Sequence, residues 1–174
     1  MTAGGNLVQA ISFYPEQTQS KEILDAYVAQ KEDLFKKVFS SKTMADGEAS
    51  EQFLSFALRI ISNQQISNER KQEVVTLAGQ QMLKQIKDDP AGARTQLFFG
   101  SFLVNIGDAK NGIRYLDAAR SLSSKKQQII FEQIHAYYNL GDKKKALALA
   151  QEAYDLNPGV ADAKKILEQL QTEK

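Results

Sequence analysis

The chain has 174 residues, which is enough for one domain with a sizeable core or for a short array of stacked helices. Its 22 Lys and Arg residues nearly balance 21 Asp and Glu, and a net charge of +1 argues against nucleic-acid binding and against a polybasic membrane-surface role. The absence of cysteine excludes disulfides, thiolate catalysis and cysteine-ligated zinc.

The N-terminal residues 1–5 lack the charged and apolar regions of a signal peptide, so we predict a flexible leader. The most apolar stretch, Leu97 to Ile106, has ten residues, whereas a bilayer crossing needs roughly 20. We therefore expect no membrane insertion in this segment. Composition leaves the cellular compartment open.

Residues 6–90 carry apolar side chains at helical spacing throughout. The spacing predicts helices over about 6–13, 20–39, 48–62 and 68–87, which we interpret as degenerate helical pairs. Ser20 is placed to cap the second of them. Gly79 lies inside the fourth, where glycine costs about 1 kcal/mol relative to alanine. We expect a neighbouring helix to approach closely at that point.

From residue 91 the sequence repeats with a period of 34 residues. The segment Asn105 to Lys110 recurs as Asn139 to Lys144, with four of six residues identical. Ala119 likewise matches Ala153. A 34-residue period with two helices per unit is typical of tetratricopeptide repeats, in which each unit buries its apolar face against its neighbours.

Residues 91–124 and 125–158 resemble two such repeats. Phe99, Gly100 and Leu103 match the large–small–large packing triplet of the first helix, and Asp155 to Pro158 closes the second unit in a family-typical way. One departure is Ile134, which takes the small position that Gly100 fills. The first helix of the second repeat, residues 125–158, is therefore expected to pack less closely.

The loops Gly107-Asp108 and Gly141-Asp142 fit the turns between the paired helices. Glycine tolerates left-handed backbone geometry at a helix C-terminus, and the following aspartate can cap the next helix. The resemblance implies an all-α fold, an antiparallel helix-pair solenoid of tetratricopeptide-like superhelical type with about nine helices. Residues 159–174 would then form a capping helix.

Reactive groups are scarce. His135 is the only histidine, whereas nucleophilic catalysis needs a base, an orienting partner and a nucleophile, and a metal site needs several ligands. Neither a Walker motif nor a dinucleotide fingerprint is present. We therefore predict no catalytic residues, no metal, no cofactor and no enzymatic activity.

What remains is a surface. In tetratricopeptide arrays the first helix of each pair lines a groove, and the resemblance places ten residues along it: Arg94, Leu97, Phe98, Ser101, Asn105, Gln128, Phe131, His135, Tyr138 and Asn139. Aromatic groups mixed with amides suit peptide recognition. The alternative is that Leu97, Phe98 and Phe131 simply pack in the core. The basic clamp by which some family members grip a carboxylate terminus is not matched.

A narrower resemblance rests on LFKKVFSSKTMADGEASEQFL (34–54), ARTQLFFGSFLVNIGDAKNGIRYLDAARSLSS (93–124) and the AYYNLGDKKKALALAQEAYDLNP unit. These segments are similar to the soluble C-terminal region of O-antigen ligase-like bacterial membrane proteins. The resemblance implies a role in assembly or partner recruitment, and it supplies no catalytic residue.

Three functional hypotheses follow. The first is a non-catalytic module that binds a protein or peptide ligand. The second is a structural spacer or homo-oligomerising domain whose groove is filled by its own N-terminal helices. The third is an RNA-binding helical repeat, which the near-neutral charge opposes.

Overall fold

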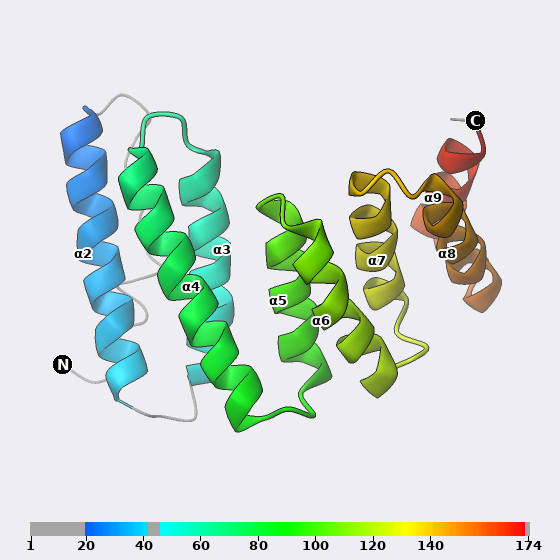
Figure 1. Cartoon of the computed structure of the whole chain (residues 1–174), viewed down its shortest axis with the longest axis horizontal. Helices are drawn as coiled ribbons and strands as arrows, with labels where there is room; N and C mark the ends of the chain where they lie inside the picture. Colours follow the sequence, from blue (N-terminus) through cyan, green and yellow to red (C-terminus); the bar gives the residue numbers. More distant parts are fainter. Residues whose placement is uncertain (1–19, 42–45, 173–174) are drawn as a thin grey trace. The chain divides into compact units, whose positions relative to one another are not determined.

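The computed structural model describes residues 20–41 and 46–172, and its regular secondary structure there is entirely helical. The eight helices of these ranges are α2 (Lys21–Ser40), α3 (Asp46–Ser62), α4 (Asn68–Asp88), α5 (Ala93–Asn105), α6 (Ala109–Leu122), α7 (Gln127–Asn139), α8 (Lys143–Leu156) and α9 (Ala161–Thr172). Helices adjacent in sequence pack against each other within each half of the chain (Figure 1). The predicted all-α fold of paired helices is confirmed.

The predicted leader over 1–5 and the predicted helix over 6–13 lie outside the described residues. The other predicted helices end within two residues of their observed bounds. Ser20 caps α2 as expected, since its side chain accepts a hydrogen bond from the Ile23 N–H. Among the described residues, no helix combines the length and the apolar character that a bilayer crossing needs.

The chain divides into two compact units, residues 1–88 and 89–174. In the first unit, α2, α3 and α4 contact one another (Figure 1). Its core is an aromatic cluster in which Phe35 of α2 lies 4.7 Å from Phe53 and 5.8 Å from Phe56 of α3, between ring centroids. Tilted ring pairs at this distance add to the free energy of simple burial.

Gly79 of α4 does not mark a close helix approach. Among the described residues, a Cβ atom at this position would meet no heavy atom within 4 Å beyond the backbone of its own helix, so the prediction of a tightly packed neighbour is wrong.

In the second unit, α5 packs on α6, α6 on α7, α7 on α8 and α8 on α9, and the first helices of the two pairs, α5 and α7, also touch. Two apolar clusters fill the spaces. One joins α5, α6 and α7 through residues such as Leu97, Leu116 and Ile129. The other joins α7, α8 and α9 through Ile134 and Ala150 among others. Each helix pair therefore buries its apolar face against the next.

The turns within the two pairs have the geometry that their sequences predict. Gly107 and Gly141 adopt left-handed φ angles of 91° and 77°. The Asp108 side chain accepts a hydrogen bond from the Asn111 N–H at 3.3 Å. The Asp142 side chain accepts the equivalent bond from the N–H of residue 145 at 3.1 Å. The same six-residue segment thus forms the same turn twice.

Gly100 and Gly112 bring α5 and α6 together. A Cβ at Gly112 would lie 2.8 Å from the carbonyl oxygen of Gly100, and a Cβ at Gly100 would lie 2.7 Å from the Leu116 side chain. The equivalent residues of the next pair are Ile134 and Ala146, and α7 packs less closely on α8 than α5 does on α6. The expected effect of Ile134 is therefore present.

Candidate functional site

A small depression opens between α7 and α9 in the second unit. Its volume is about 180 Å³. Four residues of α7 and three of α9 line it: Phe131, Ile134, His135, Tyr138, Ile166, Gln169 and Leu170. We call it the α7–α9 pocket. Among the residues that the structure describes, no Asp, Glu, Lys or Arg lines it.

Three of the ten predicted groove residues meet in this pocket. Phe131 is half-buried on the core cluster, whereas His135 is exposed and Tyr138 keeps 40% of its surface accessible. The Nδ2 atom of Asn139 lies 3.2 Å from His135 Nε2, so Asn139 sets the orientation of the imidazole beside the pocket. Gln128 is exposed near the start of the same helix.

The α5 members of the predicted set lie outside the pocket. The Arg94 guanidinium lies 5.0 Å from the centroid of the Phe98 ring, within cation–π range. Asn105 donates a hydrogen bond to the Ser101 carbonyl at 2.8 Å. Arg94 and Asn105 are exposed, and Phe98 and Ser101 are half-buried.

Leu97 does not belong to any exposed face. Its side chain is 2% accessible and lies in the cluster that joins α5, α6 and α7. The core interpretation therefore applies to this residue, because a leucine between two stacked helix pairs gains more from burial than from exposure. Leu97 therefore does not belong to the predicted groove.

The α9 residues of the pocket were not predicted, because the terminal helix was interpreted only as a cap. The repeat itself carried a signal for one of them. Gln169 lies 34 residues after His135, so it is the next position in the same phase. Extending the period by one helix would have found it.

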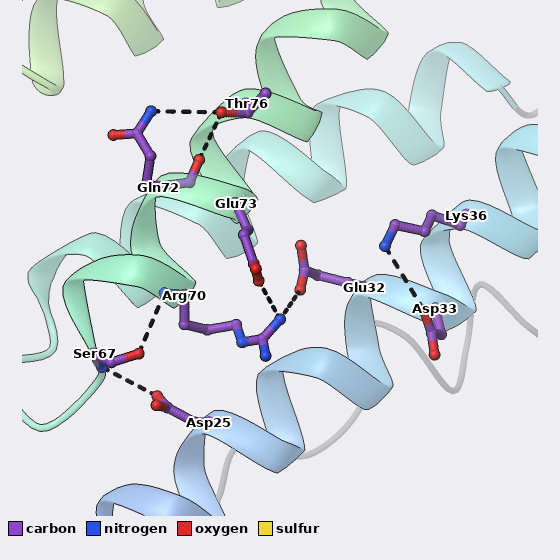
Figure 2. A network of polar contacts seen from close by, with 9 residues as sticks. All are labelled: Asp25, Glu32, Asp33, Lys36, Ser67, Arg70, Gln72, Glu73 and Thr76. Atoms are coloured by element: carbon purple, nitrogen blue, oxygen red, sulfur yellow. Dashed lines mark hydrogen bonds and ion pairs between the residues drawn. The ribbon is translucent and has the colours of Figure 1, made fainter.

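A second polar arrangement lies between α2 and α4 in the first unit, and Figure 2 shows its contacts. Arg70 Nη1 lies 3.1 Å from the Glu32 carboxylate, and the same nitrogen also contacts the Glu73 carboxylate. Ser67 caps α4 by accepting the Arg70 N–H at 3.2 Å, while Asp25 accepts the Ser67 N–H at 3.0 Å. These contacts fasten the start of α4 to α2.

Glu32 is the unusual member of this network, because its residue is only 3% exposed. Burial raises the pKa of the Glu32 carboxyl above its ordinary value, although the hydrogen bond from Arg70 acts in the opposite direction. An open depression of about 610 Å³ lies alongside, with Lys36, Glu69 and Thr76 among its lining residues. Arg70 is already held by two carboxylates, so the arrangement fits a link between helices.

A comparable bridge crosses α6, α7 and α8 in the second unit. The buried Gln133 amide donates to Asp117 at 2.6 Å and accepts from Arg120 at 2.8 Å. Arg120 also contacts the Glu152 carboxylate. Because Gln133 directly precedes the pocket residue Ile134, this bridge fixes how α7 presents its pocket face.

The described ranges hold no group of three or more His, Asp or Glu side chains that could bind a metal ion together. No protein-family model matches the chain, and no curated protein matches it in a sequence comparison. We therefore infer the function from the geometry of the second unit.

Proposed function

We propose that the chain is a non-catalytic helical-repeat module that binds a protein or peptide ligand along the face formed by α5 and α7. The observation that carries the proposal is the α7–α9 pocket, where Phe131, His135 and Tyr138 come together with an accessible, mainly apolar surface. Exposed aromatic groups beside amides are the composition that protein-binding surfaces favour.

A tetratricopeptide-like repeat is the structural basis that we propose for this face. It is supported by the 34-residue spacing, by the two glycine–aspartate turns and by the Gly100–Gly112 approach. In an array of this type the first helices lie side by side, so that exposed residues from several helices can contact one extended ligand. The contact between α5 and α7 fits that arrangement.

The test is selection of binding peptides from a random dodecapeptide library displayed on phage, with the full chain as bait. Peptides that bind should lose at least tenfold in affinity when Tyr138 is replaced by alanine, because an exposed interface tyrosine supplies a large share of contact area. Leu156→Ala is the matched control. Leu156 has similar exposure, at 41%, but lies on α8 and lines no part of the pocket.

Two results would contradict the proposal. One is failure to select any peptide that binds the folded chain. The other is selected peptides that bind Tyr138→Ala and Leu156→Ala equally well. A mass that rises with protein concentration in sedimentation, together with no peptide binding, would instead favour the self-associating spacer.

The resemblance to O-antigen ligase-like proteins extends the proposal to partner recruitment beside a polysaccharide-handling bacterial membrane protein. The corresponding test is the reading frame upstream of the codon for Met1. Several apolar segments of about 20 residues there would support a membrane-bound parent protein. A stop codon directly upstream would contradict it.

A further inference from the structure

We infer that α9 is one wall of the binding site, and that the α7–α9 pocket takes a single uncharged apolar side chain of the partner, of the size of leucine, methionine or phenylalanine. This inference rests on the proposed function and gives the chemistry of the ligand. It changes the role of the terminal helix from a cap to half of a pocket.

The two walls are anchored in one core. Ile134 of α7 and Leu167 of α9 belong to the same buried cluster, and Ala146, Ala150 and Ala153 of α8 complete it. Alanines leave room for α7 and α9 to pack on α8 at short range. The cluster holds both walls in place before any ligand arrives, which lowers the entropy lost on binding.

The volume of the pocket selects the size of its occupant. A cavity of about 150 Å³ can hold one benzene molecule, and the α7–α9 pocket measures about 180 Å³. Sites for drug-sized ligands occupy about 300–1,000 Å³. The pocket is therefore large enough for one apolar side chain.

The lining selects the charge of the occupant. Ile134, Ile166 and Leu170 are apolar, and within the described ranges no ionised Lys, Arg, Asp or Glu faces the occupant. An ionised anchor would lose part of its hydration here without gaining a counter-charge, which disfavours its binding. His135 and Gln169 are exposed residues of the lining and give it a polar component beside the apolar one.

The inference can be tested first without a ligand. The chain contains no tryptophan, so Gln169→Trp and Gln171→Trp each introduce one fluorescent reporter on α9. Both positions are exposed, and only residue 169 lines the pocket. We expect the indole at 169 to occupy the pocket, with blue-shifted emission and at least twofold weaker quenching by acrylamide than the indole at 171. Equal emission and quenching would overturn the inference.

Binding supplies the second test, with peptides selected as above. Gln169→Trp should weaken their binding at least tenfold, and Gln171→Trp should leave it unchanged, while circular dichroism verifies that both variants fold. Each peptide should contain one Leu, Met or Phe whose replacement by Ala costs at least tenfold, and replacement by Lys or Glu at least as much.

The outcomes separate the two proposals. Peptides that depend on Tyr138 but bind Gln169→Trp normally would overturn the role of α9 and leave the proposed function standing. Peptides whose anchor is a charged residue would do the same. Failure of every peptide to bind, combined with a blue-shifted indole at 169, would contradict the proposed function and the ligand chemistry while leaving the pocket itself intact.

Discussion

In each helix pair of the second unit, one helix supplies a bulky side chain where the other helix is small. The two pairs differ in which helix supplies it. In the pair α5–α6 the first helix supplies Gly100 and the second supplies Leu116. In the pair α7–α8 the first helix supplies Ile134 and the second supplies Ala150, each 34 residues further along. Leu116, Ile134 and Ala150 are all buried.

This exchange shows what the repeat conserves. Each pair contains one bulky side chain at these two positions, whereas the helix that supplies it differs, because close packing constrains the sum of the side chains. Identical residues are therefore concentrated in the turn, where Gly107 and Gly141 need positive φ angles that other residues rarely adopt.

A double-mutant cycle gives the largest expected effects. Leu116→Ala should lower the free energy of unfolding by about 2–5 kcal/mol, as expected for truncation of a buried leucine. Gly100→Ile should cost about 3 kcal/mol through overpacking against Leu116. The double variant copies the Ile134–Ala150 arrangement. Its loss in free energy of unfolding should be smaller than the sum of the two single losses by about 1–3 kcal/mol. Urea denaturation measures all four proteins, and additive losses would contradict the exchange.

Two glycines provide the next comparison. Gly112→Ala should destabilise the chain by about 1–3 kcal/mol, because the new methyl group would lie 2.8 Å from the Gly100 carbonyl oxygen. Gly79→Ala should instead stabilise it by about 0.5–1 kcal/mol, since alanine favours the helix and no atom of the described neighbouring residues would lie within 4 Å of the new methyl group. Thermal unfolding of both variants checks the opposite signs. Stabilisation by Gly112→Ala would show that α5 and α6 do not touch there.

The polar bridge distinguishes the second pair from the first, where Phe99 occupies the position of Gln133. Gln133→Leu should cost about 1–2 kcal/mol, because it removes the hydrogen bonds to Asp117 and Arg120 while keeping the volume. Chemical denaturation measures the loss. No loss would mean that the buried amide contributes nothing to the stacking of α6 on α7.

The smallest expected effect concerns the difference between the polar networks of the two units. Arg120 pairs with the buried neutral Gln133, whereas Arg70 pairs with the buried Glu32, whose pKa burial raises above 4.5. Because the pKa of Glu32 is raised in the folded state, its contribution to stability is fully present below the pKa of the unfolded state. That contribution is lost as the pH rises through the pKa of the folded state.

The wild-type chain should therefore gain stability relative to Glu32→Gln as the pH falls from neutral toward the ordinary glutamate pKa of 4.5. One pKa unit corresponds to about 1.4 kcal/mol, which sets the scale. Denaturation at several pH values measures this difference. Glu69→Gln, at an exposed position of α4, is the control that should not change the pH dependence. Equal pH dependence of the wild type and Glu32→Gln would contradict the role of burial.

Much of the fold was predictable because its signals are local. Apolar spacing located the helices, and the Gly107-Asp108 and Gly141-Asp142 segments located the turns between them. The site was harder to predict. Whether a side chain such as Leu97 faces the core or the solvent depends on how neighbouring pairs stack, and this is not encoded in the spacing along one helix. The role of α9 was missed because the 34-residue period was not extended from His135 to Gln169, although the sequence contains that spacing.

The exchange of bulky side chains also explains why the position of Gly79 was misjudged. A helical glycine marks close packing only when a neighbouring helix supplies the missing volume, as Leu116 does for Gly100. No such neighbour lies over Gly79 in the part of the chain that the structure describes. The sequence of a single helix does not contain that information.

The central claim is that a ligand binds to the second unit between α7 and α9. Hydrogen–deuterium exchange on the full chain, with and without a selected peptide, tests it most directly. The account predicts slower exchange in residues 93–105, 127–139 and 161–172, with no change in residues 21–88. Slower exchange confined to α2 and α4 would contradict it.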